Sequence, residues 1–153
     1  MAFLILSIGM LGIASLQLIS LKSGRVAELR TVAVIKAEEV LERIRTNQLQ
    51  VLAYASDVGN LGTDNGCNDY TGSINVCTST EMAADDIYNW KLDLTNSLPG
   101  GTTAAIVVVA PTSKNPTATV TVTINWQERN AETQTMDDMS YSVSSHICNN
   151  TSC

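Results

Sequence analysis

Four cysteines are the residues of this chain best suited to covalent chemistry. They are Cys67, Cys77, Cys148 and Cys153, and all four follow Tyr54. No two of them form a Cys-x-x-Cys pair, which argues against zinc ligation and redox catalysis. Four cysteines can pair in three ways, and the short separations favour Cys67 with Cys77 and Cys148 with Cys153. This pairing predicts an oxidising compartment.

A single histidine, His146, is the next candidate for chemistry. With a serine and a carboxylate from Asp85-Asp86 or Asp137-Asp138 it would have the residue types of a hydrolytic triad. No serine, however, lies in the Gly-x-Ser-x-Gly pattern of a nucleophile elbow. A lone histidine near a strand end is more often an ordinary surface or packed side chain. We therefore predict no enzymatic activity and no cofactor.

Hard oxygen donors surround the first cysteine, at Asp64-Asn65-Gly66 and Asn68-Asp69. Carboxylate and amide oxygens are the ligands that calcium prefers. Their spacing does not match an EF-hand, and clusters of Asn, Asp and Gly are ordinary turn residues. We predict no metal site and keep calcium binding as an alternative to be tested.

These residues belong to a chain of two unlike parts. The 153 residues are 44% hydrophobic and 16% charged, with a net charge of −6. The apolar content excludes a disordered chain, and the negative charge argues against direct nucleic-acid binding. Up to Tyr54 there are six basic and four acidic residues; beyond it there are three basic and eleven acidic. The change in composition predicts a boundary between Tyr54 and Asn60.

The first part opens with an uncharged stretch, residues 1–21. A helix of this length spans about 30 Å, which matches the hydrocarbon core of a bilayer. A signal peptide would need a basic start and a shorter apolar run. We predict that residues 1–21 form a transmembrane segment or a segment that packs in a bundle of helices. Lys22 and Arg25 follow it and, by the positive-inside rule alone, would place the rest in the cytoplasm; the cysteines favour the periplasm.

Residues 22–54 continue the same helix in amphipathic form. No proline interrupts them, and Glu39 and Arg43 are four residues apart in the favourable order. Apolar residues recur at helical spacing, which predicts a stripe that packs on the following domain. The stripe comprises Val26, Leu29, Ala33, Ala37, Val40, Leu41, Ile44, Val51 and Leu52. We expect one helix from Ala2 to Tyr54.

Residues 55–153 are predicted to form a globular head of the α+β class. A loop spans Asp57–Ser79, and Thr78 with Glu81 forms a capping box that begins a second helix. Pro99-Gly100-Gly101 ends that helix. Three strands follow in an antiparallel meander. They are expected at Ala104–Ala110, Thr117–Trp126 and Met139–Ile147. The residues predicted to pack the head are Trp90, Leu94, Leu98, Val120, Val122, Ile124 and Trp126.

The segment Ala2–Gln17, AFLILSIGMLGIASLQ, resembles the N-terminal helix of type IV pilins, and within them that of minor pilins of the PilV family. Three later stretches also resemble this family, in the same order. They are the helix end Glu38–Asn47, the Trp90-to-Gly101 element that ends in Leu-Pro-Gly-Gly, and the Val/Ile strand that ends at Trp126.

The resemblance implies a type IV pilin-like fold and a structural role in assembling, initiating or modifying a type IV pilus, or fimbrium. The implied partners are other minor and major pilins and the inner-membrane assembly machinery. The protein would be a single-pass inner-membrane protein with a periplasmic head and then part of the cell-surface pilus. Such pili serve adhesion, twitching motility and DNA uptake. Helix packing would involve Phe3, Leu4, Ile5, Ile8, Leu11, Ile13 and Leu16.

One feature departs from the family pattern. The family's leader, its processing site and the glutamate near the mature N-terminus would all precede Met1. We expect a misassigned start or a truncated chain, and we carry over no processing residue. Two alternatives stay open: a minor pseudopilin of type II secretion, which shares the helix, and a membrane-anchored adhesive or ligand-binding module.

Overall fold

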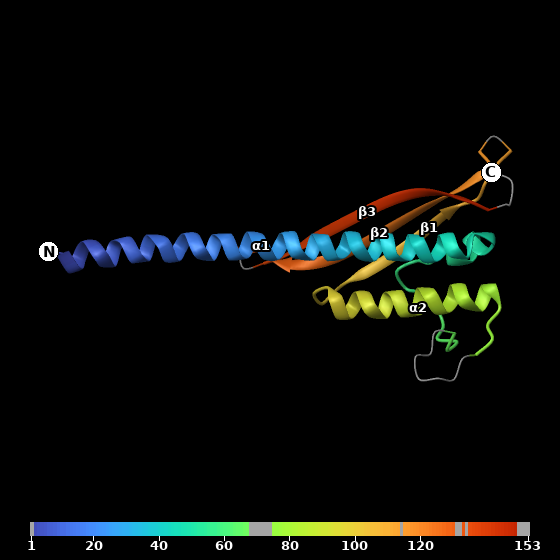
Figure 1. Ribbon diagram of the computed structural model, residues 1–153, viewed down its shortest axis with the longest axis horizontal. Coiled ribbons are helices and arrows are strands. Elements are labelled where there is room, and N and C mark those ends of the chain that lie inside the picture. The colour runs from blue at the N-terminus through green and yellow to red at the C-terminus, as the bar shows by residue number, and fades with distance from the viewer. Residues whose placement is uncertain (1, 68–74, 114, 131–132, 134, 150–153) are drawn as a thin grey trace.

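The computed structural model describes residues 2–67, 75–113, 115–130, 133 and 135–149. A long helix α1 (Ala2–Thr46) is followed by a short 3₁₀ helix η1 (Gln48–Tyr54) and a second helix α2 (Ser79–Ser97). Strands β1 (Thr103–Val109), β2 (Thr117–Arg129) and β3 (Met136–Cys148) complete the head. Figure 1 shows α1 and α2 antiparallel to each other beside the sheet, with the first half of α1 extending beyond the head.

The sheet is an antiparallel meander in the order β1-β2-β3. At its centre Val120 of β2 lies opposite Val108 of β1 and Ser145 of β3. Because side chains alternate along a strand, one face of β2 is apolar and the other carries Thr119, Thr121 and further polar residues. The predicted α+β class with an antiparallel meander is therefore confirmed.

The hydrophobic core lies between the apolar face of the sheet and the two helices. All seven residues that we expected to pack the head are at most 5% exposed. From α1 the core receives Ala33, Ala37, Val40, Leu41 and Ile44; from η1 it receives Val51 and Tyr54. Two alanines on α1 let the helix backbone approach its neighbours closely.

The prediction of one helix to Tyr54 is wrong at its end. α1 ends at Thr46, and Asn47 has a non-helical backbone (φ −115°, ψ 39°). Its side-chain amide donates hydrogen bonds to the Ser79 carbonyl at 2.7 Å and to the Tyr54 hydroxyl at 3.3 Å. Ser79 lies 32 residues further along the chain and Tyr54 lies 7 residues further, and the turn at Asn47 lets η1 bring Tyr54 into the core.

The second helix begins as predicted. The Thr78 hydroxyl accepts a hydrogen bond from the Glu81 amide, and the Glu81 carboxylate accepts one from the Thr78 amide at 2.8 Å. The helix ends at Ser97, just before Pro99. A capping box satisfies two backbone amides that have no partner within the helix, which explains why this local motif predicted the start correctly.

The strands are found where they were expected, but two extend further. β2 continues to Arg129 instead of Trp126, and β3 begins at Met136 instead of Met139. The added rungs include Gln127 opposite Asp138, and they lack apolar alternation. Backbone pairing of a hairpin needs no apolar side chains, so a prediction based on alternation stops too early.

Candidate assembly interface

The two halves of α1 have different surroundings. All side chains from Gly24 to Glu28 are exposed, and the first partly buried core neighbours are Leu29 and Val32. Figure 1 shows the helix before this point projecting away from the head. At 1.5 Å per residue the projecting part is about 40 Å long. It is the part of the fold that is positioned to meet other molecules.

The seven residues predicted for helix packing all lie on this projecting part. Their backbones are helical, as expected. Ile13 is 59% exposed, while the side chains of the other six lie outside the described part of the structure. In the described part of the chain, no helix combines the length and apolar content that crossing a membrane requires. The role of these seven residues stays a prediction.

Ion pairs connect the second half of α1 to α2. Lys36 is paired with Asp93 of α2 and with Glu39 one turn along α1. Arg43 contacts Glu39 at 2.7 Å and Asp86 of α2 at 3.1 Å. In addition, the Trp90 indole donates a hydrogen bond to the Lys36 carbonyl at 2.8 Å. The two helices are therefore held by polar contacts as well as by the core.

These contacts shift the ionisation of the residues involved. Hydrogen bonds to Asp93 and then Glu39 raise the pKa of Lys36. Burial acts to raise the pKa of Glu39, but hydrogen bonds from Lys36 and Arg43 outweigh it and the pKa is lowered. Each shift favours the charged form, so Lys36 and Glu39 stay charged across the neutral range.

Asp86 connects three elements inside the head. It is 7% exposed, and its second carboxylate oxygen accepts a hydrogen bond from the Tyr54 hydroxyl at 2.7 Å. Burial, and then this contact with Asp86, raises the pKa of Tyr54, so the phenol stays neutral. Through Arg43, Tyr54 and its own helix, Asp86 ties together α1, η1 and α2.

We did not predict that Asp86 connects α1, η1 and α2, although its position in the sequence indicated a buried polar contact. It lies three residues after Ala83 and four before Trp90, and therefore on the apolar stripe of α2. A carboxylate at a buried helix position normally has a charged or hydrogen-bonding partner. That pattern indicated a polar contact but not which residues would make it.

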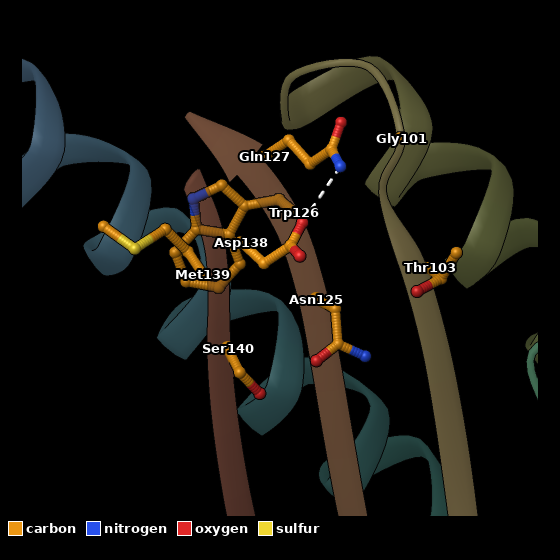
Figure 2. A pocket seen from close by; sticks show the side chains of 8 residues that line it. All are labelled: Gly101, Thr103, Asn125, Trp126, Gln127, Asp138, Met139 and Ser140. Carbon is orange, nitrogen blue, oxygen red and sulfur yellow. Dashed lines mark hydrogen bonds between the residues drawn. The ribbon is translucent and has the colours of Figure 1, made fainter. Parts of the chain in front are cut away.

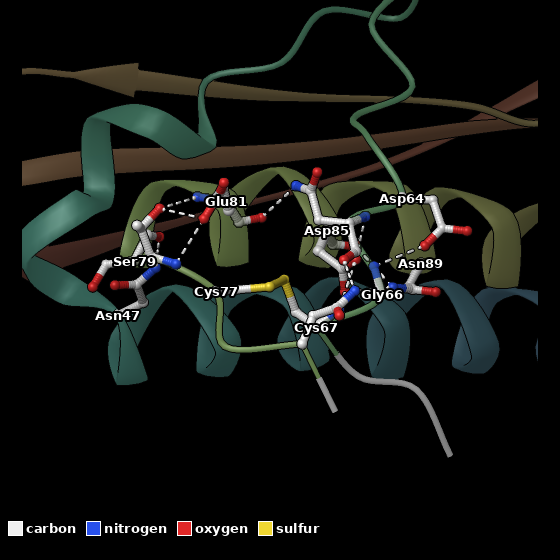
Figure 3. Close-up of a disulfide and its surroundings, with 12 residues drawn as sticks. Asn47, Asp64, Gly66, Cys67, Cys77, Ser79, Glu81, Asp85 and Asn89 are labelled. Carbon is white, nitrogen blue, oxygen red and sulfur yellow. Dashed lines mark hydrogen bonds between the residues drawn. A yellow bond between two sulfur atoms is a disulfide. The ribbon is translucent and has the colours of Figure 1, made fainter. Parts of the chain in front are cut away.

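A disulfide closes the loop before α2, as Figure 3 shows. Cys67 and Cys77 are bonded, with their Cα atoms 5.8 Å apart, which confirms this predicted pair. Cys148 is also in a disulfide, and Cys153, its predicted partner, lies outside the described residues.

The buried Asp85 of α2 holds the loop that carries Cys67. Its carboxylate accepts hydrogen bonds from the backbone amides of Asn65 at 2.8 Å and Cys67 at 3.3 Å, which fixes the loop on α2.

A buried lysine holds the segment between η1 and this loop. The Lys91 ammonium donates hydrogen bonds to the Ser56 hydroxyl and to the carbonyls of Asp57 and Asn60, at 2.5–2.8 Å. Burial lowers the pKa of Lys91. Gly62 follows in a left-handed conformation, and a Cβ there would lie 2.5 Å from the Ala84 carbonyl. The backbone therefore runs directly against α2.

The residues of the rejected triad are not brought together. His146 contacts the Thr119 hydroxyl at 3.2 Å on the outer face of the sheet. Asp85 and Asp86 lie on α2, behind the opposite face, and are hydrogen-bonded there. Asp137 lies nine residues along β3 from His146, a distance of about 30 Å. Within the described residues, no nucleophile, base and acid share one site.

The calcium alternative finds no support in the described part of the loop. Asp64 accepts a hydrogen bond from the Gly66 amide at 3.1 Å, as in an ordinary turn. No group of three or more metal-ligating side chains is present among the described residues. Asn68 and Asp69 lie outside that part of the chain.

A long N-terminal helix, half of which packs on an antiparallel meander, defines the protein as an α+β protein of pilin-like architecture. The sequence is similar to one such group. The model of the Tt1218-like family, described as type IV pilin Tt1218, matches residues 15–88. This match supports a type IV pilin with a structural role. No curated protein and no solved structure matches the chain. Its placement among the minor pilins of the PilV type stays a prediction.

Proposed function

We propose that the protein is a minor pilin that takes part in the initiation, assembly or modification of a type IV pilus. The observation that carries this proposal is the division of α1, whose first half projects about 40 Å while its second half is fixed to the head. The projecting sequence has no charged residue up to Leu21. An uncharged apolar helix of this kind is stable in lipid or among other helices.

In this proposal the helix is stored in the inner membrane and then packs beside the helices of other pilins. The head faces the periplasm and later the filament surface. The Cys67–Cys77 disulfide and the acidic composition of residues 55–153 suit such an exposed, oxidising position. The proposed partners are other minor and major pilins and the inner-membrane assembly machinery. Adhesion, twitching motility and DNA uptake are the processes that such a filament would serve.

A charge placed in the projecting helix tests this proposal. Ile8→Asp should abolish recovery of the protein in sheared pili, because a carboxylate in a helix bundle or bilayer is unfavourable. The matched control is Thr95→Asp, at an exposed position of α2, which should be incorporated normally. Immunoblots of sheared filaments and pilus counts by electron microscopy give the result. Equal incorporation of both variants would contradict the proposal.

The same variants separate the two alternatives. For a minor pseudopilin of type II secretion, Ile8→Asp would reduce protein secretion and leave pilus number unchanged. For a membrane-anchored adhesive or ligand-binding module, Ile8→Asp would reduce the amount of protein displayed at the surface, and neither pilus number nor protein secretion would change. A loss of pili or of pilus-associated protein supports the minor-pilin role specifically.

A further inference from the structure

The outer face of the sheet, opposite the helices, carries an uncharged row of polar side chains. Four alternate rungs that pair β2 with β3 place their side chains on this face, and all of these side chains are exposed or half-buried. The rungs are Asn125 with Ser140, Thr123 with Ser142, Thr121 with Ser144, and Thr119 with His146. We call this set the hydroxyl row. It contains no Asp, Glu, Lys or Arg, although residues 55–153 have eleven acidic side chains.

A hollow of about 330 Å³ lies at the Asn125 end of the hydroxyl row. Its polar lining includes Thr103, Asn125, Gln127, Asp138 and Ser140. Figure 2 shows the Gln127 amide spanning from β2 to Asp138 on β3, and this hydrogen bond is 2.9 Å long. Gly101 forms part of the rim in a left-handed conformation (φ +84°).

The polar groups of this surface suit a ligand that both donates and accepts hydrogen bonds. In the row, the Thr121 and Ser144 hydroxyls are 2.8 Å apart, and those of Thr123 and Ser142 are 3.1 Å apart. A hydroxyl has one donor and two acceptor sites, so each pair keeps capacity for a further partner. In the hollow, Asn125 offers both an amide donor and a carbonyl acceptor.

Charge and size narrow the ligand class further. The acidic head repels anions, which argues against nucleic acids and phosphorylated peptides. The hollow presents a single carboxylate, that of Asp138, which can accept hydrogen bonds from hydroxyl groups. From Asn125 to Thr119 the row is about 20 Å long, which is enough for several linked sugar rings.

We propose that the hollow and the hydroxyl row together bind a neutral oligosaccharide, with one sugar unit in the hollow and the chain extended along β2 and β3. This site would add carbohydrate binding to the structural role proposed above. It does not depend on that role, since the face belongs to the head whether or not the protein enters a filament.

The test uses the full chain in a zwitterionic detergent, because glycoside detergents would themselves compete as neutral sugars. Linear oligomers of glucose, N-acetylglucosamine and mannose are titrated by isothermal calorimetry up to millimolar concentrations, with oligogalacturonate as the anionic comparison. We expect at least one neutral oligomer to bind and the anionic one not to bind. No binding of any neutral oligomer, or binding of the anion alone, overturns the proposal.

Variants then locate the site. Asn125→Ala should weaken binding about tenfold, since it removes a hydrogen-bonding group without filling the hollow. Ser140→Tyr, at an exposed position, should block the hollow by volume instead. Thr95→Ala on α2 is the control and should bind as the parent does. The melting temperature of each variant is measured first, and it should equal that of the parent. If Asn125→Ala and Ser140→Tyr both keep the full affinity for the oligosaccharide, this assignment of the site is wrong.

Discussion

The two halves of α1 are one continuous helix in two different environments. In the second half, Ala37 and Ile44 are fully buried and Lys36 and Arg43 are paired with α2. In the first half, Ile13 is 59% exposed and residues 24–28 are all exposed. The same secondary structure is therefore stabilised by the head in one half, while the other half presents its surface for partners outside this chain. Matched substitutions in the two halves test this difference.

The largest effect is expected from removing an apolar side chain from the anchored half. Ile44→Ala should lower the free energy of unfolding by about 3 kcal/mol, because it leaves a cavity in the core. The matched variant Ile13→Ala in the projecting half, at a position 59% exposed, should change it by less than about 0.5 kcal/mol. Urea unfolding followed by circular dichroism measures both. Equal losses would show that the two positions do not differ in packing.

The next effect concerns the polar contacts between α1 and α2. Asp86→Asn replaces a buried acceptor of hydrogen bonds from Arg43 and Tyr54, and should lower stability by about 2 kcal/mol. Asp93→Asn alters an ion pair whose carboxylate is 46% exposed, and should cost about 0.5 kcal/mol or less. The same unfolding assay compares them. A larger loss for Asp93→Asn would reverse our ranking of the two contacts.

A smaller, pH-dependent effect is expected at Glu39. Its pKa is lowered in the folded state, so its contribution is present above the unfolded value of 4.5 and is lost as the pH falls through the folded value. The difference in melting temperature between the parent and Glu39→Gln should therefore be constant near neutral pH and disappear in acid. Glu38→Gln, at the adjacent exposed position, is the control for the loss of one negative charge and should change the melting temperature less.

The smallest effect is expected from removing the projecting half altogether. A chain that begins at Val26 keeps Leu29 and all the buried residues of α1, so its free energy of unfolding should stay within about 0.5 kcal/mol of the parent's. Differential scanning calorimetry of both chains in the same detergent gives the comparison. A clear fall in melting temperature would mean that the first half also stabilises the head.

Local patterns predicted much of the fold. The capping box of Thr78 and Glu81 fixed the start of α2, and strict alternation from Thr117 to Trp126 identified the central strand with its apolar face. The pairing of Cys67 with Cys77 followed from their short separation. Each of these features depends on neighbours within about ten residues, which the sequence shows directly.

The polar contacts could not be predicted in the same way. Lys36 and Asp93 are 57 residues apart, and Tyr54 and Asp86 are 32 apart. A sequence reveals that a charge lies on an apolar stripe, but the partner depends on how two helices cross. The end of α1 at Thr46 has a similar origin, because the side chain of the next residue, Asn47, donates a hydrogen bond to the Ser79 carbonyl, 32 residues along the chain.

The sequence by itself determined that an uncharged apolar helix precedes an acidic α+β head, because composition, hydrophobic period and capping are local properties of the chain. Only the tertiary structure decided how far the head extends along that helix, and which polar groups on α2 hold it. It also brought the uncharged side chains of β2 and β3 together on one face. These outcomes depend on contacts between residues distant in sequence, whose geometry is set when the core packs.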